Sequence, residues 1–388
     1  MNVKPSKRMA QFSPAIFGDL KRAALKKAET GAPIFDLSLG SPDIPPADIV
    51  RNKLSETSSE EKMYGYTLGG TERFNEAVAH YYKRRSNVDI DPHTEIVQTM
   101  GSQEGIVHLP FAFCNKGDIV LTTDPAYVAY DIGIRLAEAE SYYMPLTHEN
   151  NFLPDLKAIP EDILKRAKLL ILNLPGNPVP ATPTKEYFEE VVAFAKEHHI
   201  LVLHDAAYSE YYFEGDKPMS FLATPGAKEI GIEINSLSKS FSLAGARIAY
   251  IAGNSEAVTI MKQLKSNLDY GTFAPIQEAA IVALDHAEEI TDRLRATFSE
   301  RHHVLMNGMK ELGWETTASS GGMFVWAKFP QSMDDIDFVF HVIEEVGVVL
   351  VPGSIFGPAG KGFVRIALVQ EVEVLKAAVE QLKKLPNA

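Results

Sequence analysis

One lysine is surrounded by residues that could make it a covalent anchor for a cofactor. Lys239 lies in NSLSKSFSLAGARIAY (235–250), among four serines and eight residues before Arg247. A lysine that forms an imine must be uncharged part of the time, and enclosure near a cation lowers its pKa for that purpose. Hydroxyl side chains and a guanidinium together make a phosphate cradle. Taken alone, a short serine–lysine motif is more often part of a solvated loop, so it needs support from elsewhere in the chain.

A carboxylate at the end of a different apolar segment provides that support. Asp205 closes ILVLHD (200–205) and is followed by AAY, which places Tyr208 three residues later. A fixed carboxylate keeps a pyridine nitrogen protonated, and a protonated pyridine ring acts as an electron sink. The alternative is that Asp205 only caps a helix. Taken with Lys239, Asp205 predicts a site for pyridoxal 5′-phosphate (PLP).

Two further turns carry suitable polar groups. Asn177 in NLPGNP (173–178) could donate to the phenolate oxygen of the cofactor, a role that Tyr208 could share. Ser102 in GSQEG (101–105) stands at a strand-to-helix junction, where backbone N–H groups bind phosphate. Each motif also has an ordinary structural explanation, a Pro/Gly/Asn turn for the first and a helix N-cap for the second.

The elements that must position these residues alternate between strands and helices. Between about residues 95 and 253, apolar runs predict strands at 95–100, 118–123, 168–174, 200–205, 231–236 and 248–253. Helical spacing lies between them, for example at 126–139 and 184–199. This alternation is typical of a parallel sheet covered by helices on both faces. Ligands of such sheets bind beyond the carboxyl ends of the strands, which is where the polar residues lie.

The chain is too long for one compact core, at 388 residues. After Pro275 a long charged helical stretch (276–311) leads into mixed strands and helices that predict a smaller α+β domain. IFDLSLG (34–40) is a lone strand outside the alternation, so the N-terminal segment should pack with that domain. We therefore expect a large PLP-binding domain at 46–285 and a small domain made of 1–45 and 286–388.

These motifs together resemble the class I/II aminotransferases of PLP fold type I, over almost the whole chain. Within that family the chain looks similar to the bacterial branch of aspartate, aromatic and LL-diaminopimelate aminotransferases. The matching segments are LSLGSPDIPP (37–46), YGYTLGG (64–70), NLPGNP (173–178), DAAY (205–208), SLSKSFSLAGARIAY (236–250), GGMFVWAKFP (321–330) and FVRIALV (363–369). The resemblance implies an α/β fold, with a mostly parallel central sheet between helices and a smaller α+β domain.

The resemblance also implies a role for each matching residue. Lys239 would form the internal aldimine and move a proton between Cα and C4′, while Asp205 pairs with the ring nitrogen. Asn177 and Tyr208 would hold the phenolate oxygen. Tyr127 would stack on the ring, and Arg365 and Gly40 would bind the α-carboxylate of the substrate. The residues implied to hold the phosphate are Ser102, Gln103, Ser236, Arg247 and a tyrosine of the neighbouring subunit.

The sequence departs from the family pattern at two places. The asparagine turn continues as NPVPA (177–181) where the family has NPTG, which alters the turn but keeps Asn177. The tyrosine before Gly70 is one residue out of the usual register. Tyr66 is the choice for the residue that reaches the phosphate of the partner, and Tyr64 is the alternative. Either tyrosine implies that the active unit is a homodimer.

The expected activity is a ping-pong transfer of an α-amino group between an L-amino acid and a 2-oxo acid. A PLP-dependent β-elimination, as in C–S lyases of the same fold, shares all these motifs and is the alternative. The sequence does not select the amino donor.

Composition excludes other classes of function. The net charge of −13 disfavours a nucleic-acid surface. Cys114 is the only cysteine, so the chain has no internal disulfide and no cysteine cluster for zinc, and we expect no metal and a cytoplasmic location. No apolar run approaches the length of about 18 residues that a membrane span needs. No GxGxxG motif follows a predicted strand, which argues against a nicotinamide enzyme.

Overall fold

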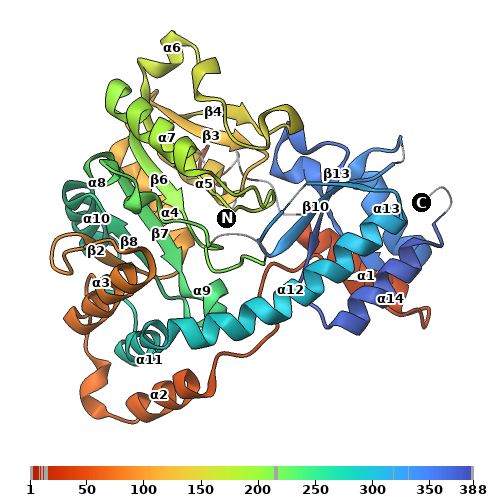
Figure 1. The fold of residues 1–388 in the computed structure, drawn as a ribbon, viewed down its shortest axis with the longest axis horizontal. Coiled ribbons are helices and arrows are strands. Elements are labelled where there is room, and N and C mark those ends of the chain that lie inside the picture. The colour runs from red at the N-terminus through yellow and green to blue at the C-terminus, as the bar shows by residue number, and fades with distance from the viewer. Residues whose placement is uncertain are drawn as a thin grey trace.

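A seven-stranded sheet forms the centre of the larger part of the molecule (Figure 1). The computed structural model describes residues 3–7, 9, 12, 16–213, 217–317, 319–330 and 332–385. In spatial order the strands are β2 (Ile96–Thr99), β8 (Ala249–Gly253), β7 (Gly231–Ser236), β6 (Leu201–Asp205), β5 (Ala167–Leu172), β3 (Ile119–Asp124) and β4 (Glu140–Pro145). The fold is therefore α/β, as predicted.

All but one of these strands run in the same direction. Strand β8 is antiparallel to both of its neighbours, β2 and β7. The connection from β7 to β8 is short and contains only α9 (Leu237–Ser240) and a 3₁₀ turn. A parallel neighbour usually requires a crossover through a full helix, and this connection contains none, which favours the antiparallel return. The lysine segment thus forms the turn at the carboxyl end of β7.

Six predicted strands are confirmed, but β4 was not predicted from the sequence. This strand pairs only with β3, at the edge of the sheet, and most of its side chains are partly or fully exposed. It therefore lacks the continuous apolar run that marks a central strand. The helix predicted at 126–139 was also too long, since α5 covers Ala129–Leu136.

Helices cover both faces of the sheet. Buried side chains of α4 (Ser102–Phe113), α5 and α10 (Ser255–Leu268) pack on one face. Those of α3 (Glu72–Ser86), α7 (Lys185–His198) and α11 (Ala274–Asp285) pack on the other. The remaining helices of this part are α2 (Asp48–Ser58), α6 (Glu161–Leu164) and α8 (Ala227–Ile230). Since alternate residues of a strand point to opposite faces, each strand contributes to both layers.

A second group of elements surrounds its own core. Its sheet has the order β12 (Val351–Pro352), β13 (Phe363–Ala367), β10 (Phe324–Lys328) and β9 (Glu315–Thr316). The lone strand β1 (Phe35–Asp36) pairs with β11 (Val348–Val349) in this part, as expected of the N-terminal segment. The helices are α1 (Phe17–Ala28), α13 (Asp335–Val346) and α14 (Val372–Leu382). The domain boundaries expected from the sequence stay a prediction, since the core of this part also includes Ala207, Tyr208 and Tyr211 from the segment after β6.

One long helix connects the two parts. The stretch predicted at 276–311 is divided at His286 into α11 and α12 (Ala287–Glu311), and α12 runs from the large part to the small one (Figure 1). None of the helices in the described ranges is both long and apolar enough to cross a membrane.

Candidate active site

Lys239 lies at the carboxyl end of β7, in the short helix α9. Its amine donates a hydrogen bond to the backbone carbonyl of Gly40, and the hydroxyl of Tyr211 donates to the Lys239 carbonyl oxygen at 2.9 Å. Burial, followed by the positive charges of Arg365 and Arg247, lowers the pKa of Lys239 to about 8. The amine is therefore uncharged in a substantial fraction of molecules near neutral pH, as imine formation requires.

Asp205 ends the neighbouring strand β6 and is almost fully buried. The hydroxyl of Tyr130 donates to one carboxylate oxygen at 2.8 Å, and the backbone N–H of Ala207 donates to the other at 3.1 Å. Burial raises the pKa of Asp205, while these donors and the charge of Lys239 oppose that rise. Tyr130 was not predicted from the sequence. Its only signal was its position three residues after Tyr127, and the two rings are in edge contact, with centres 5.8 Å apart.

Arg365 enters the site from β13 of the small part. Its guanidinium donates to the side-chain oxygen of Asn177 at 2.9 Å and to the carbonyl of Ser38 at 2.7 Å. It is 4% exposed, and its carbon lies 4.3 Å from the ring centre of Phe324. Within the described part of the chain its Nε has no hydrogen-bond partner and no carboxylate pairs with it. Burial lowers the pKa of Arg365 to about 10, so the side chain stays positive at neutral pH.

Asn177 and Tyr208 lie beside Arg365. Both are buried, and Asn177 is within hydrogen-bonding reach of Tyr208. Because the Asn177 oxygen accepts from Arg365, its amide N–H₂ stays available as a donor. Burial, with the nearby charge of Asp205, raises the pKa of Tyr208 and keeps its hydroxyl protonated as a second donor. NPVPA thus leaves the Asn177 side chain inside the site.

The predicted phosphate residues gather around the start of α4. Gly101 has φ +78°, and a Cβ there would collide with the guanidinium of Arg247. Ser102 begins the helix, and Ser236 caps α9 by accepting the Ser238 N–H at 3.2 Å. Gln103 approaches the hydroxyl of Tyr127 at 3.5 Å. Helix N–H groups, hydroxyls and an exposed cation are the kinds of group that bind a phosphate, so these residues are suited to that ligand.

Tyr66 lies on the surface and contacts Tyr270, with ring centres 4.9 Å apart. It is 84% exposed, and within the described residues its hydroxyl has no partner. Tyr64, by contrast, donates its hydroxyl to the carbonyl of Ser58 at 2.8 Å. Of the two candidate tyrosines, Tyr66 has the free hydroxyl.

Comparison with known proteins identifies the family. The model of the aminotransferase class I and II family matches residues 32–382. The chain belongs to this family. An LL-diaminopimelate aminotransferase of Aquifex aeolicus is 42% identical over 98% of each chain, and one of Halothermothrix orenii is 38% identical over 97% of each. Among solved structures, apo-BacF of Bacillus subtilis superposes with a TM-score of 0.95 at 36% identity over 100% of each chain. A Thermus thermophilus aspartate aminotransferase double mutant gives 0.91 at 25% identity, over 98% of this chain and 99% of that one.

The protein is accordingly a PLP-dependent aminotransferase of fold type I that uses amino acids and 2-oxo acids. The full-length relatives are named for amino-group transfer, which supports this activity and not the alternative of a C–S lyase. The residues described above fit the cofactor. They provide a partly uncharged lysine amine, a buried carboxylate, and a glycine whose missing Cβ leaves room beside Arg247.

The pKa of Lys239 gives a testable pH dependence. Only the unprotonated amine attacks an aldehyde, so the rate at which the cofactor-free protein attaches pyridoxal should rise with pH and level off above a midpoint of about 8. Pyridoxal is preferred to PLP because it has no phosphate that titrates in this range. The attachment rate can be followed by absorbance between about pH 6.5 and 10.5. A midpoint near 10.5, the ordinary value for lysine, would contradict the described environment.

Proposed function

We propose that this aminotransferase binds the α-carboxylate of its substrates through Arg365 and takes its amino group from LL-diaminopimelate or a closely similar amino acid. The observation that carries the first part is the buried guanidinium of Arg365, which has no carboxylate partner among the residues that the structure describes. A buried charge is costly unless it is paired, so the site gains most from a ligand that brings an anion. The second part is supported by relatives at 42% and 38% identity, both named LL-diaminopimelate aminotransferases.

The other residues would have the roles that the family resemblance implies. When bound, PLP supplies a protonated ring that stabilises negative charge at the substrate Cα. Lys239 would anchor the cofactor and then carry the proton between Cα and C4′, because its lowered pKa lets it accept a proton near neutral pH. Asp205 would hold the ring nitrogen protonated, while Asn177 and Tyr208 would donate to the phenolate oxygen.

A different set of residues would hold the phosphate and the ring of the cofactor. Ser102, Gln103, Ser236 and Arg247 would bind the phosphate around the start of α4, and Tyr127 would lie against the ring. Gly40 would bind the substrate carboxylate with its N–H, close to where its carbonyl now accepts from Lys239.

Replacing Arg365 by methionine should raise KM for the amino donor by about 100-fold while kcat changes less. The reason is that the α-carboxylate of the bound substrate loses a buried, charged hydrogen-bond donor. Steady-state kinetics of the purified variant measure both constants. The matched control is the amine that lacks the α-carboxylate, which should react equally poorly with the wild-type and variant proteins. An unchanged KM for the amino acid would show that another group binds the carboxylate.

A panel of amino donors tests the substrate proposal. Each donor is mixed with the loaded enzyme without an acceptor, and the loss of the lysine-linked cofactor band reports one half-reaction. LL-diaminopimelate should react faster than aspartate or phenylalanine. A faster reaction with either of these would overturn the proposed donor while leaving the aminotransferase assignment unchanged.

We also propose that the active unit is a homodimer in which Tyr66 completes the site of the partner. The segments around Tyr66 and Tyr270 lie side by side, since the backbone N–H groups of Thr67 and Leu68 donate to the Tyr270 carbonyl. They expose several large apolar side chains: Tyr64, Tyr66, Leu68, Leu268, Tyr270 and Phe273. An exposed apolar patch of this kind marks a protein–protein contact.

Mixed dimers can test whether Tyr66 acts between subunits. Tyr66→Phe alone should lower kcat/KM by about tenfold, as expected for one lost hydrogen bond to a charged group. A dimer of one Lys239→Ala chain and one Tyr66→Phe chain has one intact site only if Tyr66 serves the partner. Such a dimer should then recover about half of the wild-type activity. Recovery no better than that of Tyr66→Phe would contradict the proposal.

A cytoplasmic location is part of the proposal as well. It is supported by the single cysteine, Cys114, which leaves no pair for a stabilising disulfide. Cell fractionation with an antibody against the chain tests it.

A further inference from the structure

The segment that follows β6 carries two tyrosines that bear on the site. Residues 206–211 contain Tyr208, which lies beside Asn177, and Tyr211, whose hydroxyl holds the Lys239 carbonyl. The segment has only turn structure, with single backbone bonds such as Ser209 N–H to the Ala206 carbonyl. Short turns of this kind do not fix a side chain firmly, so the position of both tyrosines must depend on contacts from outside the segment.

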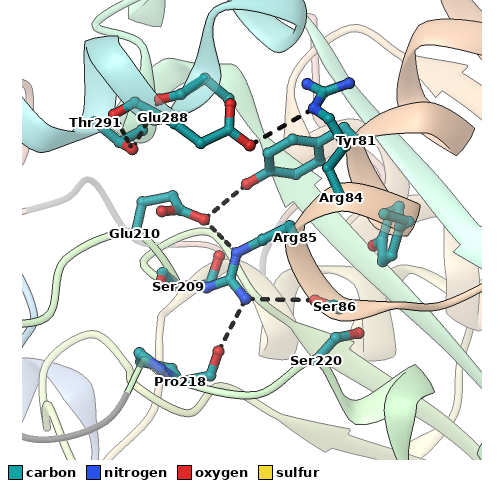
Figure 2. A network of polar contacts seen from close by, with 12 residues as sticks. Tyr81, Arg84, Arg85, Ser86, Ser209, Glu210, Pro218, Ser220, Glu288 and Thr291 are labelled. Carbon is teal, nitrogen blue, oxygen red and sulfur yellow. Dashed lines mark hydrogen bonds and ion pairs between the residues drawn. The ribbon is translucent and has the colours of Figure 1, made fainter.

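Arg85 of α3 provides one such contact (Figure 2). Its guanidinium donates to the carbonyls of Ser209 and Pro218, both at 2.9 Å, and its Nε donates to the carboxylate of Glu210. The Tyr81 hydroxyl donates to the same Glu210 oxygen at 2.7 Å. The side chains of Arg85 and Glu210 are 7% and 4% exposed, so solvent screens this pair little.

Arg295 of α12 binds the second oxygen of Glu210, at 3.2 Å. Its guanidinium also lies 4.5 Å from the ring centre of Tyr212. Tyr212 forms an isolated antiparallel β-bridge with Gly321 of the small part. Glu210 therefore accepts hydrogen bonds from α3 of the large part and from α12, the helix that connects the two parts. Burial alone would raise the pKa of Glu210, but the charge and hydrogen bonds of Arg85 lower it, so the carboxylate stays ionised.

We propose that Glu210 is a positioning residue for the transfer reaction, which holds Tyr208 and, through Tyr211, Lys239 at the places where they act. Glu210 lies two residues after Tyr208 and one before Tyr211, so a shift of its backbone displaces both. This inference rests on the roles proposed for Tyr208 and Lys239. A purely structural ion pair would have no such relation to the cofactor.

Substitution of Glu210, and separately of its partner Arg295, tests the inference on the PLP-loaded dimeric protein. Glu210→Gln should raise the pH midpoint of the absorbance change of the lysine-linked cofactor by about one unit. The reason is that a displaced Tyr208 donates less well to the phenolate oxygen, which favours the protonated form. We also expect kcat to fall about tenfold with KM nearly unchanged. Arg295→Gln should also raise the midpoint, by less than Glu210→Gln does. If Glu210→Gln does not fold, Arg295→Gln is the variant that tests the inference.

Two further variants make the outcome decisive. Glu95→Gln removes a carboxylate that pairs with Lys228 at 2.6 Å, at the opposite end of the sheet, and should leave the midpoint unchanged. Tyr208→Phe should shift the midpoint at least as far as Glu210→Gln does. If Tyr208→Phe shifts the pH midpoint while Glu210→Gln and Arg295→Gln only lower thermal stability, the inference about Glu210 is wrong and the proposed site stands. If Tyr208→Phe does not shift it, the proposed role of Tyr208 fails, and the inference fails with it.

Discussion

Lys239→Ala should lower kcat/KM by about 10⁴-fold or more, because the substitution removes the residue proposed as both the covalent anchor and the proton carrier. The structure gives this amine two properties that suit both tasks. Its pKa is lowered to about 8, and it points from the end of β7 toward the loop that contains Gly40. Steady-state rates with a reactive donor, measured at saturating PLP, check the effect.

A lysine outside the site is the matched control. Lys262 of α10 also has a pKa lowered by burial, but its amine donates to the carbonyl of His93 at 2.7 Å. Lys262→Ala should therefore keep wild-type activity. Borohydride reduction followed by peptide mass analysis adds a readout that is independent of turnover. Cofactor mass on the peptide with Lys239 is expected, and its presence on any other lysine would overturn the assignment.

Much of the large part could be predicted because its strands are buried on both sides. Such strands are continuous apolar runs, and the polar residue after each run marks its carboxyl end. Lys239 follows β7 and Asp205 ends β6; these strands are neighbours in the sheet, so the proximity of the two residues followed from the fold class. The position of Arg365 did not follow from any pattern. It lies in a different sheet, and only the family resemblance indicated that it belongs to the site.

The residues that were missed depend on contacts between distant segments. Tyr130 reaches Asp205 from 75 positions away, and Arg85 reaches Glu210 from 125. Whether such residues meet in space depends on the order of the strands in the sheet, and that order could not be inferred from the pattern of a single sequence. Tyrosine and arginine on an amphipathic helix are ordinary residues, since their polar ends usually reach water. Their partners became evident only when the strands were placed.

Asp205→Asn should lower kcat by about 10²–10³-fold while the protein still binds PLP. The amide has nearly the same shape and can still accept the Ala207 N–H, but it carries no charge to keep the ring nitrogen protonated. The residues proposed to bind the phosphate around the start of α4 do not include Asp205, so binding of the cofactor should persist. Turnover and the PLP content of the purified protein should be measured on the same sample.

Tyr130→Phe separates the charge of Asp205 from its hydrogen bonding. This variant removes the 2.8 Å bond to the carboxylate and leaves the charge, so we expect a loss of no more than about tenfold. A much larger loss in Asp205→Asn than in Tyr130→Phe would show that the negative charge is what the reaction needs. Equal losses would mean that Asp205 acts mainly by holding Tyr130 in place. Because Tyr127 contacts Tyr130, the effect would then pass to the residue proposed to stack on the cofactor ring, and the electrostatic role proposed for Asp205 would be wrong.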